Sequence, residues 1–187
     1  MNIFVLDNDP VVSAQLQCDK HVVKMIVESA QMLSTAHRIL DGVPEIRPSK
    51  SGKTNQKYWR HKDPGMEDRL YAAVHRGHPC TVWTMESAQN YQWHYQHFVA
   101  LCDEYTHRYD KIHLTDKLLR EPLEVIPWNI PLTNQTPFAL AMQANPECIH
   151  DDPVTSYRSF YQTKQERFKM VWTDRPVPEW FNELRSA

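Results

Sequence analysis

The chain has 187 residues, of which 41% are hydrophobic and 24% charged, with six Trp and eight Tyr. This composition excludes a disordered protein and predicts one globular domain with a single substantial core. The formal net charge of −2 argues against a protein that coats long nucleic acid by bulk charge. No apolar run reaches the ~18 residues of a membrane span, and the first residues lack the basic start of a secretory signal. We therefore expect a cytoplasmic protein with no membrane partner.

The expected elements are helices separated by polar or proline-rich segments. After a turn at 7–10, a first helix, straight or bent, runs from Pro10 or Val11 to Leu40, and Asp41-Gly42 ends it. The later segments are a loop over 44–66, a helix over 66–74, a long helix over 81–109, an extended proline-rich connection over 121–137, and helices over 138–143 and 154–171. We see no β-alternation. The sequence thus predicts an all-α single domain over residues 1–187, built on two long helices plus several shorter ones.

Two stripes run along the first long helix, because side chains three, four or seven positions apart share a helical face. The apolar stripe, which should face the core, consists of Val22, Ile26, Ser29, Ala30, Leu33 and Leu40. The roughly opposite stripe consists of His21, Lys24, Glu28, Gln31 and Thr35. Taken alone, the polar stripe is typical of a solvated face on which Lys24 and Glu28 form an i,i+4 pair.

The loop over 44–66 is the basic patch that a DNA-binding function requires. Its basic residues are Arg47, Lys50, Lys53, Lys57, Arg60 and Lys62, against the acidic Glu45 and Asp63, with Tyr58 and Trp59 among them. Basic residues interleaved with aromatic ones suit a phosphate backbone and an unstacked base. A solvated loop without a ligand explains the same composition equally well.

Cysteine and histidine spacing predicts neither a disulfide nor a metal site. Cys18, Cys80, Cys102 and Cys148 are far apart, which is typical of reduced, mostly buried thiols. The chain has ten histidines, including the pairs His75/His78 and His94/His97, but an i,i+3 pair needs further ligands to hold a metal. No cofactor is expected.

Three sequence blocks resemble the pyrimidine-dimer DNA glycosylase family, the phage "endonuclease V" enzymes and their shorter bacterial relatives. The first is the segment 18–28, in which Asp19, Lys20, His21, Lys24 and Glu28 fall at the offsets of the family's signature helix. The second is Arg76-Gly77-His78-Pro79-Cys80-Thr81-Val82-Trp83, and the third is the start Met1-Asn2-Ile3-Phe4. The blocks follow the family's order up to about residue 110, whereas the C-terminal third matches only in its helical, proline- and aromatic-rich character.

The resemblance implies a helical enzyme that exposes or flips a damaged nucleotide and attacks the sugar C1′ with an amine. The Schiff base that results then eliminates and breaks the strand. Glu28 would be the catalytic carboxylate, with His21 and Lys24 on the same helix. Lys20, Lys24, Arg76 and the basic loop would bind flanking phosphates. His78 and Trp83 would be structural or site-lining residues, and Asn90 would reach the same cleft.

The nucleophile is where this chain departs from the resemblance. The phage enzyme uses a threonine amine that removal of the initiator methionine exposes. Residue 2 here is Asn2, whose side chain is large for efficient methionine removal. An α-amine, with a pKa of ~8 against ~10.4 for lysine, is more easily neutral at pH 7. The open alternatives are the N-terminal amine at Met1, an amine from Lys20 or Lys24, or no Schiff-base chemistry at all.

Two other functions fit the same residues. One is an enzyme that uses this fold and Glu28 on a modified nucleotide or base without lyase chemistry. The other is a non-catalytic binding module for nucleic acid or a protein. For the leading hypothesis, the expected partner is damaged or modified DNA with a flipped base, or else a nucleotide. We expect a monomer in the cytoplasm of a bacterium or a phage-infected host.

Overall fold

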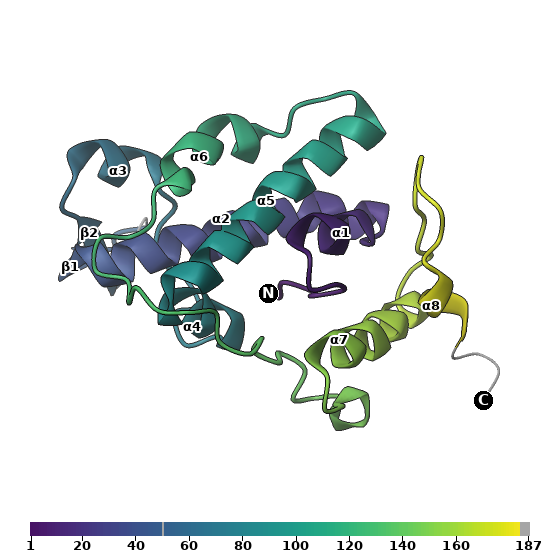
Figure 1. The fold of residues 1–187 in the computed structure, drawn as a ribbon. Coiled ribbons are helices and arrows are strands. Elements are labelled where there is room, and N and C mark those ends of the chain that lie inside the picture. Colours follow the sequence, from purple (N-terminus) through teal and green to yellow (C-terminus); the bar gives the residue numbers. More distant parts are fainter. Residues whose placement is uncertain (50, 184–187) are drawn as a thin grey trace.

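The computed structural model describes residues 1–49 and 51–183. Two long helices, α2 (Asp19–Asp41) and α5 (Ala88–Tyr109), cross and pack against each other at the centre (Figure 1). The shorter elements around them are α1 (Pro10–Gln15), α3 (Pro64–Arg69), α4 (Pro79–Glu86), α6 (Leu114–Glu124), α7 (Pro153–Gln162), α8 (Glu179–Glu183) and the 3-10 turns η1 (Pro146–Cys148) and η2 (Thr163–Glu166). Within the described part of the chain, no helix is both long and apolar enough to cross a membrane.

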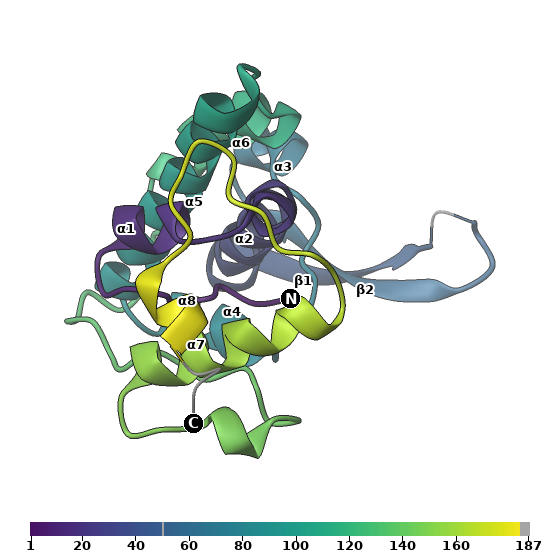
Figure 2. The same cartoon turned by 90° about the vertical axis from the view of Figure 1, so that its right-hand side faces the viewer.

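One correction concerns the fold class, because the basic loop contains strands. β1 (Gly42–Pro48) and β2 (Asn55–His61) form an antiparallel hairpin with Gly42 opposite His61 and Pro48 opposite Asn55. The hairpin projects from the helical body as an arm (Figure 2). Proline is tolerated in β1 because each strand of a two-stranded sheet is an edge strand. The molecule is therefore mainly helical rather than all-α.

Both predicted long helices are interrupted, each by a residue in extended conformation. Cys18 separates α1 from α2, and Ser87 separates α4 from α5. The Ser87 hydroxyl accepts a hydrogen bond from the Asn90 backbone N–H at 3.0 Å, so Ser87 is the N-cap of the second helix. Periodicity continues across such a break, which is why the sequence pattern suggested one helix in each case.

Other boundaries also differ from the prediction. The helix expected over 66–74 lies at Pro64–Arg69, and that expected over 154–171 is covered only by α7 and η2. Residues 138–143 are not helical, and the first residues of the proline-rich connection belong to α6, which was not predicted. These segments are short, so contacts with the body override their weak local preferences.

Several sequence-based expectations are confirmed. α2 ends at Asp41, as the Asp-Gly pair predicted. Glycine is required at position 42 because the Arg38 carbonyl oxygen lies close to its Cα, and a Cβ there would be only 2.2 Å from that oxygen. The backbone of Gly42 is not left-handed. The predicted apolar stripe is buried except at Leu40, which is half-buried. All four cysteines are free and buried.

The C-terminal third covers the start of α2. The Asp19 carboxylate accepts hydrogen bonds from the Thr173 N–H and hydroxyl, and Arg175 pairs with Glu104 of α5. Phe181 is buried against Trp172. Arg175 and Phe181 thus pack on the body of the protein, a question that the sequence left open.

Candidate active site

The N-terminal amine lies beside the predicted catalytic carboxylate. The Met1 nitrogen is 3.6 Å from Glu28 Oε2, and the Asn2 backbone N–H donates a hydrogen bond to the same oxygen at 3.0 Å. The Lys24 ammonium is 3.2 Å from the other oxygen, Oε1. The Glu28 side chain is 13% exposed, whereas that of Lys24 is 64% exposed. The site therefore combines an amine, a carboxylate and a cation at the protein surface.

A buried N-terminal segment holds the amine in this position. The Asn2 side-chain oxygen accepts hydrogen bonds from the N–H groups of Ile3 and Phe4, and its amide nitrogen donates to the Ala141 carbonyl. Phe4 adopts a left-handed conformation with φ of 56°. Residues 3–6 are all buried. Chain termini are usually poorly ordered unless they are tied down, and here both backbone and side-chain contacts fix the first residues.

His21 lies in the same region but is a buried aromatic contact. Its ring stacks on Phe4 with centroids 4.8 Å apart, and Nδ1 is 2.7 Å from the Tyr161 hydroxyl. Burial, aided by the charges of Lys24 and Lys164, lowers the pKa of His21 to about 4. The imidazole is thus neutral near pH 7, and its position favours a role in supporting the site.

The sequence pattern missed Lys164, which joins this cluster from η2. The Lys164 ammonium lies 3.3 Å from the centroid of the Phe160 ring, and the side chain is 9% exposed. Burial lowers the pKa of Lys164 to about 8. The charges of Arg167 and Lys24 act in the same direction, whereas Cys148 and Glu166 oppose the shift. Lys20 is exposed on α2, with its ammonium 4.7 Å from the centroid of the Phe168 ring. No local motif identifies Lys164, because only the packing of the C-terminal third brings it near α2.

His78, the N-cap of α4, lies near the N-terminal amine and Glu28. Its Nδ1 accepts a hydrogen bond from the Cys80 N–H, and Pro79 occupies the first helical position. Burial lowers the pKa of His78, and the nearby N-terminal amine and His75 act in the same direction. The neighbouring Arg76 is exposed, with its guanidinium 4.8 Å from the Trp59 ring of the hairpin. This contact links the site region to the basic arm.

The basic residues of the hairpin differ in their surroundings. Arg47 lies 3.7 Å from the Tyr58 ring and pairs with Glu45 and Glu67, and the Tyr58 hydroxyl donates to Glu67. Tyr58 thus packs within the base of the arm. The remaining predicted phosphate contacts on the arm are exposed, namely Lys53, Lys57 and Arg60. Lys50 was also predicted here and lies outside the described residues.

Trp83 and Asn90 belong to the core, which agrees with the structural alternative for Trp83 and leaves Asn90 without exposed surface for a substrate. Their exposed fractions are 1% and 0%. The Trp83 indole N–H donates to the Thr136 carbonyl, while the Asn90 amide binds the Trp83 carbonyl and the Thr136 backbone and hydroxyl. These two residues hold the proline-rich connection against α4 and α5.

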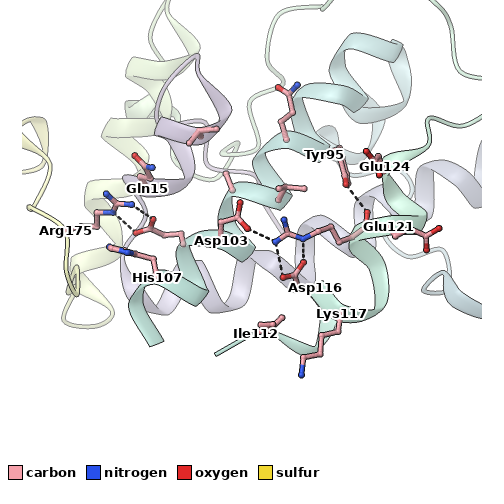
Figure 3. A pocket seen from close by; sticks show the side chains of 16 residues that line it. Gln15, Tyr95, Asp103, His107, Ile112, Asp116, Lys117, Glu121, Glu124 and Arg175 are labelled. Atoms are coloured by element: carbon pink, nitrogen blue, oxygen red, sulfur yellow. Dashed lines mark hydrogen bonds and ion pairs between the residues drawn. The ribbon is translucent and has the colours of Figure 1, made fainter. Parts of the chain in front are cut away.

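A large cavity of about 990 Å³ lies elsewhere, between α1, α5 and α6 (Figure 3). No predicted site residue lines it. Arg120 pairs there with Asp103 and Asp116, and Arg175 pairs with Glu104. Its lining carries five carboxylates, Asp103, Glu104, Asp116, Glu121 and Glu124, against three cations, Lys117, Arg120 and Arg175. This excess of negative charge disfavours a phosphate backbone.

Comparison with protein families gives one match. Residues 1–117 match the family model described as pyrimidine dimer DNA glycosylase. This range includes the N-terminal segment, Glu28, the hairpin and the start of α4. Comparisons with curated proteins and with solved structures gave no match.

Proposed function

This chain belongs to the pyrimidine dimer DNA glycosylase family, and we propose that it is a DNA glycosylase and lyase that attacks the sugar with its N-terminal amine. The proposal rests on one observation above all, the 3.6 Å separation between the Met1 nitrogen and Glu28 Oε2. A nucleophile within reach of a carboxylate is the pair that covalent catalysis at C1′ requires.

The reaction that we propose begins when the neutral amine forms a bond to C1′ as the bond from C1′ to the base breaks. The base leaves with the bonding electrons and takes up a proton. Glu28 stabilises the positive charge that develops on the sugar. Opening of the sugar ring and loss of the amine protons then give a Schiff base. Removal of a C2′ proton expels the 3′ phosphate, and the carboxylate is the group placed to move these protons.

If the initiator methionine is removed, the same chemistry passes to Asn2. Its backbone nitrogen already donates to Glu28 Oε2 at 3.0 Å, so removal would leave an α-amine in hydrogen-bond contact with the carboxylate. The proposal therefore covers both forms of the N-terminus, and the mass of the DNA-linked peptide distinguishes them.

We assign DNA binding to a basic surface on both sides of Glu28. Lys20 and Lys24 are exposed on α2, and Arg76 connects the site region to the arm through Trp59. Lys57 lies 5.2 Å from the same Trp59 ring and Lys53 is exposed near the hairpin turn. These side chains are suited to phosphates that flank a flipped nucleotide.

Borohydride trapping on duplex DNA tests the chemistry. Oligonucleotides with an abasic site or a thymine dimer are incubated with wild type, Glu28→Gln and an N-terminally acetylated form, and each is reduced by borohydride. We expect a covalent complex with wild type and its loss on acetylation. The exposed Glu121→Gln change is the matched control and should trap like wild type.

Two outcomes would contradict the assignment. A complex that survives acetylation would transfer the nucleophile to a lysine, and Lys24→Met and Lys164→Met would then identify which one. A lack of any complex with either DNA, from protein that still binds the oligonucleotide, would exclude the lyase step.

A further inference from the structure

Three buried donor side chains meet at the far end of α2. His37 and Asp41 are one helical turn apart on α2, and His61 is the last residue of β2, opposite Gly42. One donor atom from each lies within 4.8 Å of the other two. Their exposed fractions are 2%, 1% and 2%. The hairpin thus brings a second imidazole to an i,i+4 His/Asp pair.

Hydrogen bonds leave a ring nitrogen of His37 available. The Tyr91 hydroxyl donates to the Leu123 carbonyl, so it must accept from His37 Nε2, which is 2.9 Å away. These two bonds favour the tautomer with the proton on Nε2, in which Nδ1 keeps its lone pair. A neutral imidazole oriented through its other nitrogen is the usual form of a metal ligand.

His61 presents an unused nitrogen to the same point. Among residues 1–49 and 51–183, its buried Nε2 has no hydrogen-bond partner, and it lies 3.9 Å from Asp41 Oδ2. Nδ1 is 3.1 Å from the backbone nitrogen and 3.4 Å from the carbonyl oxygen of Asp63. The 3.1 Å contact is the Asp63 N–H donating to Nδ1, so a metal at Nε2 requires the ring proton to move to Nδ1, where the Asp63 carbonyl would accept it. An unpartnered buried nitrogen requires a physical explanation, and a bound ion supplies one.

The Asp41 carboxylate is fixed by a turn that follows α6. Oδ2 accepts from the Trp128 N–H at 2.8 Å, and Oδ1 accepts from the backbone and side-chain nitrogens of Asn129. The two bonds from Asn129 use both lone pairs of Oδ1, whereas Oδ2 accepts one bond and keeps a second lone pair for an ion. A cavity of about 260 Å³ adjoins the cluster and is also lined by Asp63 and Trp128. It has room for an ion and for a water molecule as a further ligand.

We propose that His37, Asp41 and His61 bind a divalent transition-metal ion of the zinc class. Two imidazole nitrogens and one carboxylate suit Zn²⁺, whereas Mg²⁺ and Ca²⁺ prefer oxygen ligands. Tetrahedral Zn²⁺ with bonds of ~2.1 Å places its donors roughly 3.4 Å apart. The donors, now within 4.8 Å of one another, move inward by side-chain rotation. The ion would join the end of α2 to the base of the arm and fix its direction.

Metal binding to untagged, chelator-treated protein is the direct test. Calorimetric titration with Zn²⁺ should give one site per chain, and Zn²⁺ should raise Tm. Co²⁺ at the same site should give the visible absorption of a tetrahedral complex, a readout that needs no variant. Acetylated and unmodified protein should bind equally, because this site is independent of the amine at Met1.

Two ligand variants and one control locate the site. His61→Gln and His37→Gln should each weaken Zn²⁺ binding at least tenfold, while His107→Gln, an exposed histidine on α5, should leave it unchanged. The second ligand variant covers the case in which one fails to fold. Wild type that binds no Zn²⁺ and gives no Co²⁺ spectrum would overturn the proposal and leave a neutral hydrogen-bonded cluster. So would binding that persists in both ligand variants, since the ion would then lie at other histidines such as His75 and His78.

Discussion

The two halves of α2 carry similar residue patterns and differ in what covers them. Lys24 and Glu28 form an i,i+4 pair near one end, and His37 and Asp41 have the same spacing near the other. The N-terminal segment approaches Glu28 but leaves Lys24 64% exposed. At the other end, the hairpin and the turn at 128–129 bury the His/Asp pair almost completely. The same spacing thus produces a solvent-accessible charged site around Lys24 and Glu28, which we call the open end of α2. Around His37 and Asp41 it produces a closed polar cluster, which we call the closed end.

The surroundings of each end determine what a substitution should change. A charged pair at the surface contributes little to the free energy of folding. Substitutions near Glu28 should therefore change activity more than stability. Buried polar groups depend on every partner, because each lost contact leaves a desolvated atom. Arg38 illustrates the second case. Its guanidinium donates to the carbonyls of Trp59, Leu70 and Tyr71 and to Glu67, and it ties α2, α3 and β2 together.

The largest expected effect is on activity at the open end. Glu28→Gln keeps the shape of the side chain but removes its charge, so we expect borohydride trapping and base release to fall by ~10²–10⁴-fold. Single-turnover kinetics on dimer-containing DNA measures this loss, and thermal unfolding should show a Tm close to that of wild type. A variant with normal kinetics would remove Glu28 from the mechanism.

The next largest effect is on stability at the closed end. Arg38→Met removes the donor to the Glu67 carboxylate and to four carbonyls, so we expect the free energy of unfolding to fall by ~3–5 kcal/mol. Urea denaturation measures this change. Arg69→Met, which removes an exposed pair with Glu121, should cost less than ~1 kcal/mol. Equal losses in the two variants would contradict the distinction between buried and exposed pairs.

The pH dependence of stability should also report on the closed end. Burial opposes ionisation of Glu67, but hydrogen bonds from Tyr58, the His61 N–H and Arg38 outweigh it and lower its pKa to about 2. A depressed carboxyl pKa stabilises the fold above the unfolded value of about 4.5. This contribution, at most ~3 kcal/mol, is lost as pH falls through about 2.

Urea denaturation of wild type and Glu67→Gln between pH 7 and pH 2.5 isolates this group. The stability difference between the two proteins should be largest at neutral pH and should shrink as the solution becomes acidic. The exposed Glu121→Gln variant should show a small difference that does not change with pH. A Glu67→Gln difference that is constant over this range would contradict the lowered pKa.

A smaller loss is expected where α2 passes into β1. Gly42→Ala would place a Cβ 2.2 Å from the Arg38 carbonyl oxygen, a backbone atom that cannot move freely. We expect a loss of ~1–3 kcal/mol in the free energy of unfolding. Gly77→Ala is the matched control, because nothing lies within 4 Å of a Cβ at that position. Similar stability of the two variants would show that the backbone relaxes around residue 42.

The smallest effect on stability is expected at the open end. Lys24→Met removes an exposed i,i+4 pair and should change the free energy of unfolding by less than ~0.5 kcal/mol. If Lys24 contacts a phosphate, the slope of log affinity for DNA against log salt should become shallower by ~1. Urea denaturation and salt titrations of DNA binding measure the two quantities. A large stability loss with an unchanged salt slope would reverse the roles of the two ends.

The sequence by itself determined the local features of the protein. Helical periodicity identified the buried face of α2, Asp41-Gly42 identified its end, and the three blocks identified the family. The helix expected from residue 81 starts two residues earlier, at Pro79. Each of these signals depends on residues within a few positions of one another, and such relations survive in any arrangement of the elements.

The tertiary structure decided which distant groups meet. It brought the amine of Met1 to Glu28, buried Trp83 and Asn90, and placed Lys164 near α2. It also folded the basic segment into a hairpin whose last residue, His61, reaches the His37/Asp41 pair. These contacts join residues from about 20 to more than 100 positions apart, and they depend on how whole elements pack. Periodicity describes one element at a time, so it specified the faces of α2 but not what would cover them.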